Sequence, residues 1–408
     1  MTRSERAVDV LIVGAGPAGL AAGAELAAAG AGRIEILERE QEAGGIPRHC
    51  HHGGFGGRLT RGGVNGPAYA RQSVAAAVSA GAGLRTGVTV TGWAGPRTVE
   101  TTGPGGLERI TAGAVVLATG ARERPRSARL VPGSRPPGVH TTGELQQAVH
   151  LYGQRIGTRA VVIGDEPVAH AAVDTLRAAG VHVVAVVTDR PAAPLRFRQR
   201  TPLLTGATVT GLTGRTRLSG VSLRHDDGRT TILRCDTVVF TGDFVPDHEL
   251  ARRGGITLDP GTRGPAYDAA YRTSRPGVFA VGNLLHAVER AGVAADEGRA
   301  VAVSVLHRLS GTDEPSGGGR RPLVVDAPLR WVAPNLTGPG GVRPLKDRFV
   351  LRTARRLSRP LLAVSQDGRE LHRQRLLLPA VPGRPFHLAA DWLERVDPHG
   401  SPVRITAL

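Results

Sequence analysis

Residues 8–19 read VDVLIVGAGPAG, an apolar strand that runs directly into a glycine-rich turn. An alanine-rich stretch from about Pro17 to Ala29 predicts a helix, and residues 33–37 predict a second strand that ends in Glu38. Strand, turn, helix, strand and acid in this order are typical of a dinucleotide-binding βαβ unit. The alternative is a glycine-rich turn without a ligand, but a lone glycine motif would not bring the second strand and the acid with it.

Each glycine of this turn has its own expected role. Gly14 permits the tight turn, Gly16 lets the backbone approach a pyrophosphate, and Gly19 lets the helix pack closely on the strand. The free amides and the positive dipole end of the helix would face the phosphates. Glu38 follows Gly19 by 19 residues, where a carboxylate can accept from ribose hydroxyls.

Length and composition narrow the class of protein. A chain of 408 residues predicts two or three domains. No stretch approaches the roughly 18 apolar residues of a membrane span. The N-terminus imitates a signal peptide, but its apolar run is the nucleotide-binding unit itself, so we expect a cytoplasmic protein. Cys50 and Cys235 are the only cysteines, which excludes both a disulfide framework and a redox-active C-x-x-C or C-x-x-x-x-C pair.

The net charge is +17 and the sequence pI is about 11.3. Lys346 is the only lysine, so nearly all basic residues are arginine, which together with the abundant Ala, Gly and Pro indicates a GC-rich genome. The arginines are scattered and aromatic residues make up only 3%, so a nucleic acid would find few stacking partners and we expect none. A basic surface that docks an acidic partner protein remains open.

The rest of the chain is divided by a connector and a linker. Residues 121–138 are rich in Arg and Pro, and a second βαβ unit follows, with a strand at 159–163 and a turn from Gly164. Residues 310–321 indicate a linker. After it, Asp367-Gly368 predicts a β-hairpin. We interpret this tail as a separate β-rich module whose small core could contain Trp331, Phe349, Phe386 and Trp392.

Four separated motifs together resemble flavoproteins of the pyridine nucleotide–disulfide oxidoreductase superfamily. They are the first βαβ unit, the turn at 118–120, the second βαβ unit at Gly164, and RPGVFAVGN at 275–283. The resemblance covers about residues 7–310. It implies an α/β fold of two interleaved Rossmann-like domains of the glutathione reductase type, with a small C-terminal β-rich module. The implied division is an FAD-binding domain (1–125 and 241–312), an NAD(P)-binding-like domain (126–240) and the module (322–408).

Three strings carry a narrower resemblance, GGIPRHC at 44–50, TGARERP at 119–125 and GVHTTGE at 138–144. They resemble members without the redox disulfide, such as the flavoprotein subunits of bacterial amine, amino-acid or glycerol-3-phosphate dehydrogenases. Carried over by position, the family's cofactor-binding residues correspond to Gly14, Gly16, Pro17, Ala18, Gly19, Glu38, Arg39, Gly44, Gly45, Ala118, Thr119, Gly120, Gly282, Asn283 and Ala294.

Three further features concern the flavin site. The resemblance implies that a helix from Val293 aims its N-terminus at the flavin pyrimidine edge, where a positive dipole stabilises the anionic reduced flavin. Asn283 stands where the superfamily has Asp; it keeps hydrogen-bonding capacity without the charge, so FAD binding should survive. Glu289 and Arg290 precede this helix and could reach a substrate, although surface charge is the favoured interpretation.

The second fingerprint contains features for and against a nicotinamide cofactor. It reads GDEPVA at 164–169 and begins with Gly164, but Glu166 replaces the second glycine, so a side chain blocks the approach of a pyrophosphate and a carboxylate repels it. Asp189 follows Ala169 by 20 residues, as expected for an acid that binds the NAD ribose. NADH, NADPH and a scaffold domain that no longer binds nicotinamide all stay open.

Residues 48–56 read RHCHHGGFG and form the segment with the most reactive side chains. Cys50 or His49 could lie near the isoalloxazine ring for proton transfer or a charge-transfer contact. A metal site is disfavoured because adjacent residues cannot easily converge on one ion and no second ligand cluster is visible. The alternative is a cofactor-lining loop with solvated histidines. We expect Cys235, which precedes an apolar strand, to be a buried hydrophobic residue.

The sequence therefore predicts an FAD-dependent oxidoreductase that transfers hydride to or from flavin N5, most simply linked to NAD(P)H. It would act on a small-molecule substrate or electron acceptor. One alternative is the FAD subunit of an amine, amino-acid or polyol dehydrogenase whose second nucleotide domain does not bind, working with a second protein subunit. Another is a scaffold subunit with a structural flavin.

Overall fold

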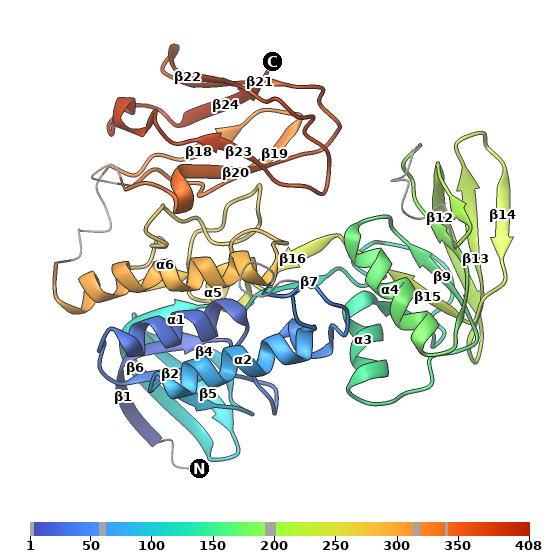
Figure 1. The fold of residues 1–408 in the computed structure, drawn as a ribbon, viewed down its shortest axis with the longest axis horizontal. Helices are drawn as coiled ribbons and strands as arrows, with labels where there is room; N and C mark the ends of the chain where they lie inside the picture. The colour runs from blue at the N-terminus through green and yellow to red at the C-terminus, as the bar shows by residue number, and fades with distance from the viewer. Residues whose placement is uncertain (1–3, 57–62, 192–200, 313–318, 339–341) are drawn as a thin grey trace. The chain divides into compact units, whose positions relative to one another are not determined.

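The computed structural model describes residues 4–56, 63–191, 201–312, 319–338 and 342–408. Residue contacts divide the chain into two compact units (Figure 1). Unit 1 contains Met1–Gly45, Tyr69–Ala121 and Pro246–Leu408, and unit 2 contains Ile46–Ala68 and Arg122–Val245. The chain thus leaves the first unit and returns to it, which confirms the predicted interleaved α/β architecture. The exact boundaries of the functional domains stay a prediction.

Unit 1 is built on a mixed sheet with strand order β3-β2-β1-β6-β5-β4. β1 (Ser4–Val13) pairs in parallel with β2 on one side and with β6 on the other, and its last four residues are fully or almost fully buried. An apolar run without alternation suits such a strand, because both of its faces are covered. The other strands are β2 (Ile34–Leu37), β3 (Gly83–Arg85), β4 (Thr89–Gly95), β5 (Thr98–Gly103), β6 (Gly106–Leu117) and β17 (Val278–Ala280), which pairs with the end of β6.

Two helices of unit 1 pack closely because small residues line their contact. α1 (Pro17–Ala28) begins with the proline that suits a first helical turn, and α6 (Ala291–Leu309) begins two residues before the predicted Val293. A β-carbon on Gly298 of α6 would overlap the carbonyl of Ala18 in α1, so only glycine permits this approach. The unit also contains α5 (Glu249–Arg253) and most of α2 (Gly66–Ser79).

Unit 2 contains a parallel sheet with strand order β11-β10-β9-β15-β8. One buried cluster joins this sheet to α3 and α4, and a second joins it to an antiparallel sheet of β12, β13 and β14. The short strands β7 and β16 pair with each other. The elements are β7 (Ala121–Glu123), β8 (Val139–Thr141), α3 (Thr142–His150), β9 (Arg159–Ile163), α4 (Pro167–Ala178), β10 (His182–Val187), β11 (Leu203–Leu204), β12 (Ala207–Gly214), β13 (Leu218–His225), β14 (Thr230–Leu233), β15 (Thr237–Phe240) and β16 (Phe244–Pro246).

The C-terminal part of unit 1 forms two β-sheets, drawn in orange and red in Figure 1. One has the order β18-β24-β21-β22 and the other β19-β20-β23. The predicted hairpin is confirmed, because Asp367 and Gly368 both have positive φ angles, 51° and 78°, between β21 and β22. The strands are β18 (Leu323–Val325), β19 (Leu329–Ala333), β20 (Arg348–Thr353), β21 (Leu361–Gln366), β22 (Arg369–Arg375), β23 (Phe386–Ala389) and β24 (Val403–Ala407).

The core of these C-terminal sheets contains three of the four predicted aromatic residues, Phe349, Phe386 and Trp392. The prediction for Trp331 was wrong. Its side chain is buried in the cluster that also contains β1 and α1. The C-terminal sheets therefore contribute a large side chain to the core of the nucleotide-binding fold. Part of the predicted linker, residues 313–318, lies outside the described residues.

Among the helices that the structure describes, none is long and apolar enough to cross a membrane.

Candidate dinucleotide site

The turn between β1 and α1 assigns different tasks to its glycines. Gly14 has a φ of +106°, and a β-carbon there would lie 2.5 Å from the carbonyl oxygen of Ala118. A β-carbon on Gly19 would overlap the carbonyl of Gly14. On Gly16 it would meet no atom of the described residues within 4 Å. Gly14 and Gly19 are therefore required by packing, whereas Gly16 leaves open space at the start of α1, as a pyrophosphate needs.

Glu38 lies at the end of β2 with its carboxylate held beneath this turn. The residue is 8% exposed. One carboxylate oxygen accepts from the amide of Ala15 at 3.0 Å and the other from the amide of Glu40 at 3.0 Å. A carboxylate offers about four acceptor positions, so capacity remains for ribose hydroxyls. Arg39 beside it is exposed, with its guanidinium 3.6 Å from the carboxylate of Asp247.

Two more predicted segments come together at the same turn. The amide of Gly44 donates to the carbonyl of Ala15 at 2.8 Å, and a β-carbon on Gly45 would lie 2.9 Å from Cα of Gly16. Ala118 contacts Gly14 from the end of β6. The next two residues, Thr119 and Gly120, each bond the backbone of Asp247: the Thr119 hydroxyl donates to its carbonyl and the Gly120 carbonyl accepts from its amide, both at 2.8 Å.

The segment that leads into α6 completes the cluster. Gly282 has a φ of +72°, and a β-carbon there would lie 2.7 Å from the side chain of Ala18 and 3.7 Å from that of Ala294. Asn283 brackets the backbone of Glu289: its Oδ1 accepts from the Glu289 amide at 2.7 Å and its Nδ2 donates to the Glu289 carbonyl at 3.3 Å. The fold thus gathers the predicted FAD segments in unit 1, and their binding role stays a prediction.

A buried ion pair supports this segment and was not predicted. Glu297 of α6 accepts from the amide of Gly282 at 2.9 Å and from Nε2 of His286 at 3.0 Å. Both side chains are buried. Burial alone would lower the pKa of His286. The charge and the hydrogen bond of Glu297 act in the opposite direction, and the pKa lies above its ordinary value. The available signal was a carboxylate on the apolar face of the predicted helix, in line with Ala294 and Val301.

Glu289 also differs from its favoured interpretation as surface charge. Its side chain is only 10% exposed and lies 2.7 Å from the guanidinium of Arg352, which belongs to β20. Arg290 is exposed, in agreement with that interpretation. The pairing of Glu289 escaped prediction because Arg352 lies 63 residues further along the chain.

The second fingerprint has a different geometry. Glu166 precedes α4, and its carboxylate folds back over the turn: it would lie 2.6 Å from a β-carbon on Gly164 and accepts from the hydroxyl of Thr241 at 3.0 Å. Burial raises the pKa of Glu166. The carboxylate therefore lies over the turn between β9 and α4, and its predicted effect on a pyrophosphate stays a prediction. Ala169 is buried in α4, and Asp189 is exposed after β10.

The segment with Cys50 and His49 belongs to unit 2. The Cys50 thiol is buried, donates to Gln146 at 3.4 Å, and has its pKa raised by burial to about 12. Burial lowers the pKa of His49 to about 4, with help from Arg48, His150 and His51. Near neutral pH the first is thus a thiol and the second a neutral imidazole. Their predicted approach to a flavin stays a prediction.

Within the described residues no group of three or more His, Cys, Asp or Glu side chains is arranged to hold a metal. His51 stacks on His150, with ring centroids 3.9 Å apart. Cys235 is buried, as predicted, and both cysteines are free.

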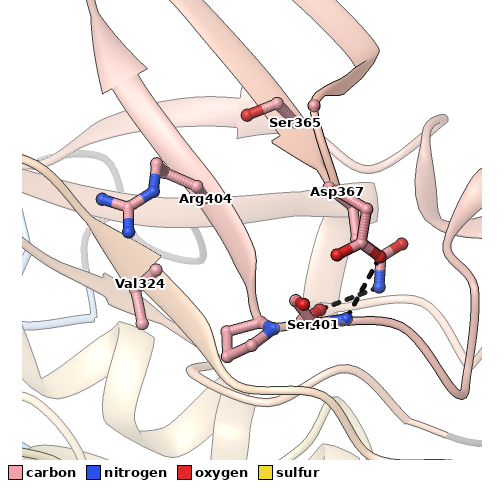
Figure 2. A pocket seen from close by; sticks show the side chains of 8 residues that line it. Val324, Ser365, Asp367, Ser401 and Arg404 are labelled. Carbon is pink, nitrogen blue, oxygen red and sulfur yellow. Dashed lines mark hydrogen bonds between the residues drawn. The ribbon is translucent and has the colours of Figure 1, made fainter.

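The C-terminal sheets contain a hollow of about 460 Å³ beside the β21–β22 hairpin (Figure 2). Several of its polar groups already have partners: Asp367 accepts from the amide of Ser401 at 3.2 Å, Gln366 donates to the carbonyl of Ser401 at 2.9 Å, and Arg404 pairs with Asp326. None of the predicted site residues lines it. The hollow therefore adds no group to the dinucleotide site.

Comparison with known proteins places this geometry in context. A family model described as pyridine nucleotide-disulphide oxidoreductase matches residues 8–298. The solved structure of T. acidophilum thioredoxin reductase superposes with a TM-score of 0.62 at 24% identity, covering 74% of this chain and 98% of that one. This likeness confirms the predicted fold.

Two curated relatives are subunits of oxidases. The alpha subunit of sarcosine oxidase from Rhizobium meliloti (strain 1021) is 36% identical over 150 residues, which are 36% of this chain and 15% of that protein. An opine oxidase subunit from Rhizobium meliloti is 29% identical over 317 residues, 67% of this chain and 58% of that protein. The chain thus spans less than two thirds of the length of these relatives. They confirm the narrower resemblance to members without a redox disulfide.

Proposed function

Because the chain belongs to the pyridine nucleotide-disulphide oxidoreductase family, whose members are FAD-dependent oxidoreductases, we propose that it is the FAD-holding subunit of an enzyme that oxidises an amine or amino acid. The sarcosine and opine oxidase relatives support this substrate class. Because both are named as subunits, we include a partner subunit in the proposal. The proposed domains are those implied by the sequence, with FAD held by 1–125 and 241–312.

The geometry of unit 1 fits FAD. The open space at Gly16 and the start of α1 would receive the pyrophosphate, and Glu38 would accept from the adenosine ribose. Gly282 and Asn283 would hold the ribityl side, with the N-terminus of α6 toward the ring. Bound FAD would supply the hydride-accepting ring, while these residues bind and orient it.

The observation that carries the choice of electron donor is the carboxylate of Glu166. It lies against Gly164 at the start of α4, in the position that a nicotinamide dinucleotide would need for its phosphates. A buried carboxylate repels a pyrophosphate and removes the space for it. We therefore infer that unit 2 is a scaffold rather than an NAD(P)H site, and that electrons enter the flavin from the organic substrate.

An NAD(P)H-linked reductase is the second candidate, because Asp189 is exposed after β10 and could bind a ribose. Anaerobic bleaching of the flavin band near 450 nm separates the two. We expect no bleaching by NADH or NADPH, and bleaching by sarcosine or another amine donor when the chain is purified with its partner subunit. Rapid bleaching by NADH would overturn the scaffold assignment. A purified chain without flavin would overturn the FAD proposal, and a flavin that dithionite alone reduces would favour a non-catalytic subunit.

A further inference from the structure

Residues 282–297, here called the cofactor turn, contain the 3-10 helix η3 (Gly282–Leu284) and the first turns of α6. Side chains within the turn hold its shape. Glu297 bonds the amide of Gly282, and Asn283 bonds both backbone groups of Glu289. A displacement of Glu289 would therefore be passed directly to Asn283, which is one of the proposed FAD-binding residues.

The C-terminal sheets contact this turn from outside through a nearly buried charge. Nη2 of Arg352 in β20 donates to the carbonyl of Val288 at 2.9 Å and to the carboxylate of Glu289 at 2.7 Å. The side chains of Arg352 and Glu289 are each 10% exposed. Charged hydrogen bonds shielded from water are strong and directional, so a single guanidinium fixes both the backbone and the side chain of adjacent residues.

Two more contacts from the C-terminal sheets reach the same turn. The ring of Trp331 in β19 lies 5.5 Å from that of His286, measured between centroids. Nζ of Lys346 lies 2.8 Å from the carboxylate of Asp296. Trp331 is also within 5.7 Å of the Arg352 guanidinium. The contacts made by β19, β20 and Lys346 therefore extend along the cofactor turn from His286 to Asp296 in α6.

We propose that Arg352 is a positioning residue: by holding Glu289 and Val288, it lets the C-terminal sheets set the affinity of the flavin site. The inference rests on the proposed function, because it concerns the FAD site of unit 1. Arg352 acts through Glu289 and Asn283 rather than by touching the cofactor. The C-terminal sheets are then a working part of the flavin site.

The test compares Arg352→Gln and Glu289→Gln with Arg404→Gln, measured on the full chain. Arg404 belongs to the same sheets and pairs with Asp326, away from the cofactor turn, so its substitution matches the charge change of Arg352→Gln. Both test variants should bind FAD more weakly, with a dissociation constant at least about tenfold higher than that of the wild type, which corresponds to 1.4 kcal/mol. The double variant should bind FAD no more weakly than the weaker-binding of the two single variants, because both substitutions break the same contact. The control should equal the wild type.

The thermal midpoint of the FAD-free chain, compared with the FAD affinity, separates positioning from mere structural support. Because each variant leaves a nearly buried charge unpaired, its midpoint should fall. Positioning predicts that FAD binding, measured well below that midpoint, is weakened as well. A lowered midpoint with unchanged FAD affinity, or wild-type affinity in Arg352→Gln, would overturn the inference. If that variant does not fold, Arg352→Lys keeps the charge but not the fork that reaches two acceptors, and wild-type affinity in it would also overturn the inference. A wild type that binds no flavin would instead overturn the proposed function on which it rests.

Discussion

At the scale of single residues, Gly14 and Gly16 separate folding from binding. Gly16 has a φ of −81°, which alanine can adopt, and its β-carbon would meet no described atom. Gly16→Ala should therefore keep or slightly raise the free energy of unfolding of the FAD-free chain, by roughly 0.4–1 kcal/mol. FAD should bind roughly tenfold or more weakly, because the methyl group takes up the space for the pyrophosphate. Flavin fluorescence titration and urea unfolding check both values.

Gly14→Ala is the matched comparison. Its φ of +106° and its contact with Ala118 make any side chain strained, so this variant should lose stability as well as FAD. A Gly16→Ala protein that binds FAD as tightly as the wild type would contradict the assigned role of Gly16.

His286 gives a dependence of stability on pH. Its pKa in the folded chain is raised above its ordinary value by Glu297, so the folded state binds the proton more tightly than the unfolded state. The stabilisation is fully present below about pH 6.5 and is lost as the pH rises through the raised pKa. Urea unfolding at a series of pH values should show this loss in the wild type. His286→Gln should reduce the slope in that window, and equal slopes in both proteins would disprove the pairing.

Sequence separation from their partners distinguishes the residues that could be predicted from those that could not. The glycines and Glu38 lie within one βαβ unit, so the spacing along the chain already encodes their arrangement. Glu289 and Arg352 are far apart in the sequence and carry no local pattern. Their charges look like surface charges until the fold buries them together.

At the scale of elements, α1 and α4 begin alike but have different N-cap residues. Each follows a parallel strand, has an extended N-cap residue and places proline at its start. The N-cap is Gly16 in α1 and Glu166 in α4. The turn before α4 therefore contains a carboxylate, next to Gly164 and Thr241, that the turn before α1 lacks.

Glu166→Gly should reopen the start of α4 to a dinucleotide. We expect NADH affinity to increase by roughly tenfold or more, because the variant removes both the repelling charge and the side chain. Glu166→Gln removes only the charge and should give a smaller gain. Quenching of NADH fluorescence measures the affinity, with FAD content as the control for folding. If neither variant gains affinity, unit 2 has lost its site through more than this residue.

The helix α1 was predicted to within one residue, but α3 was not predicted. Thr141 and Glu144 form a capping box at its start, a motif visible in the sequence. The buried face of α3 contains Thr142 and Gln146, so the apolar periodicity that marks a helix is weak there. The helix α3 was therefore missed because tertiary contacts bury polar residues on the face where apolar residues would be expected.

At the scale of the whole molecule, burial and charge shift the pKa values of several histidines in both units. In unit 2, burial lowers the pKa values of His49, His140 and His150. These groups are protonated more readily in the unfolded chain, so their contribution to stability is present above about pH 6.5 and falls as the pH decreases through the lowered values. In unit 1, burial lowers the pKa of His387 in the same way, whereas Glu297 retains His286 as a cation in this range.

The position of Trp331 has a thermodynamic consequence for the C-terminal sheets. Because its side chain fills the core around β1 and α1, those sheets cannot melt without opening that core. Differential scanning calorimetry should then resolve two heat-absorption peaks rather than three, with unit 2 melting apart from the rest. Trp331→Ala should split the larger peak, and an unsplit thermogram would refute the coupling. The three predicted domains should therefore unfold in two cooperative transitions. The C-terminal sheets and the flavin-binding fold should absorb heat in the same transition.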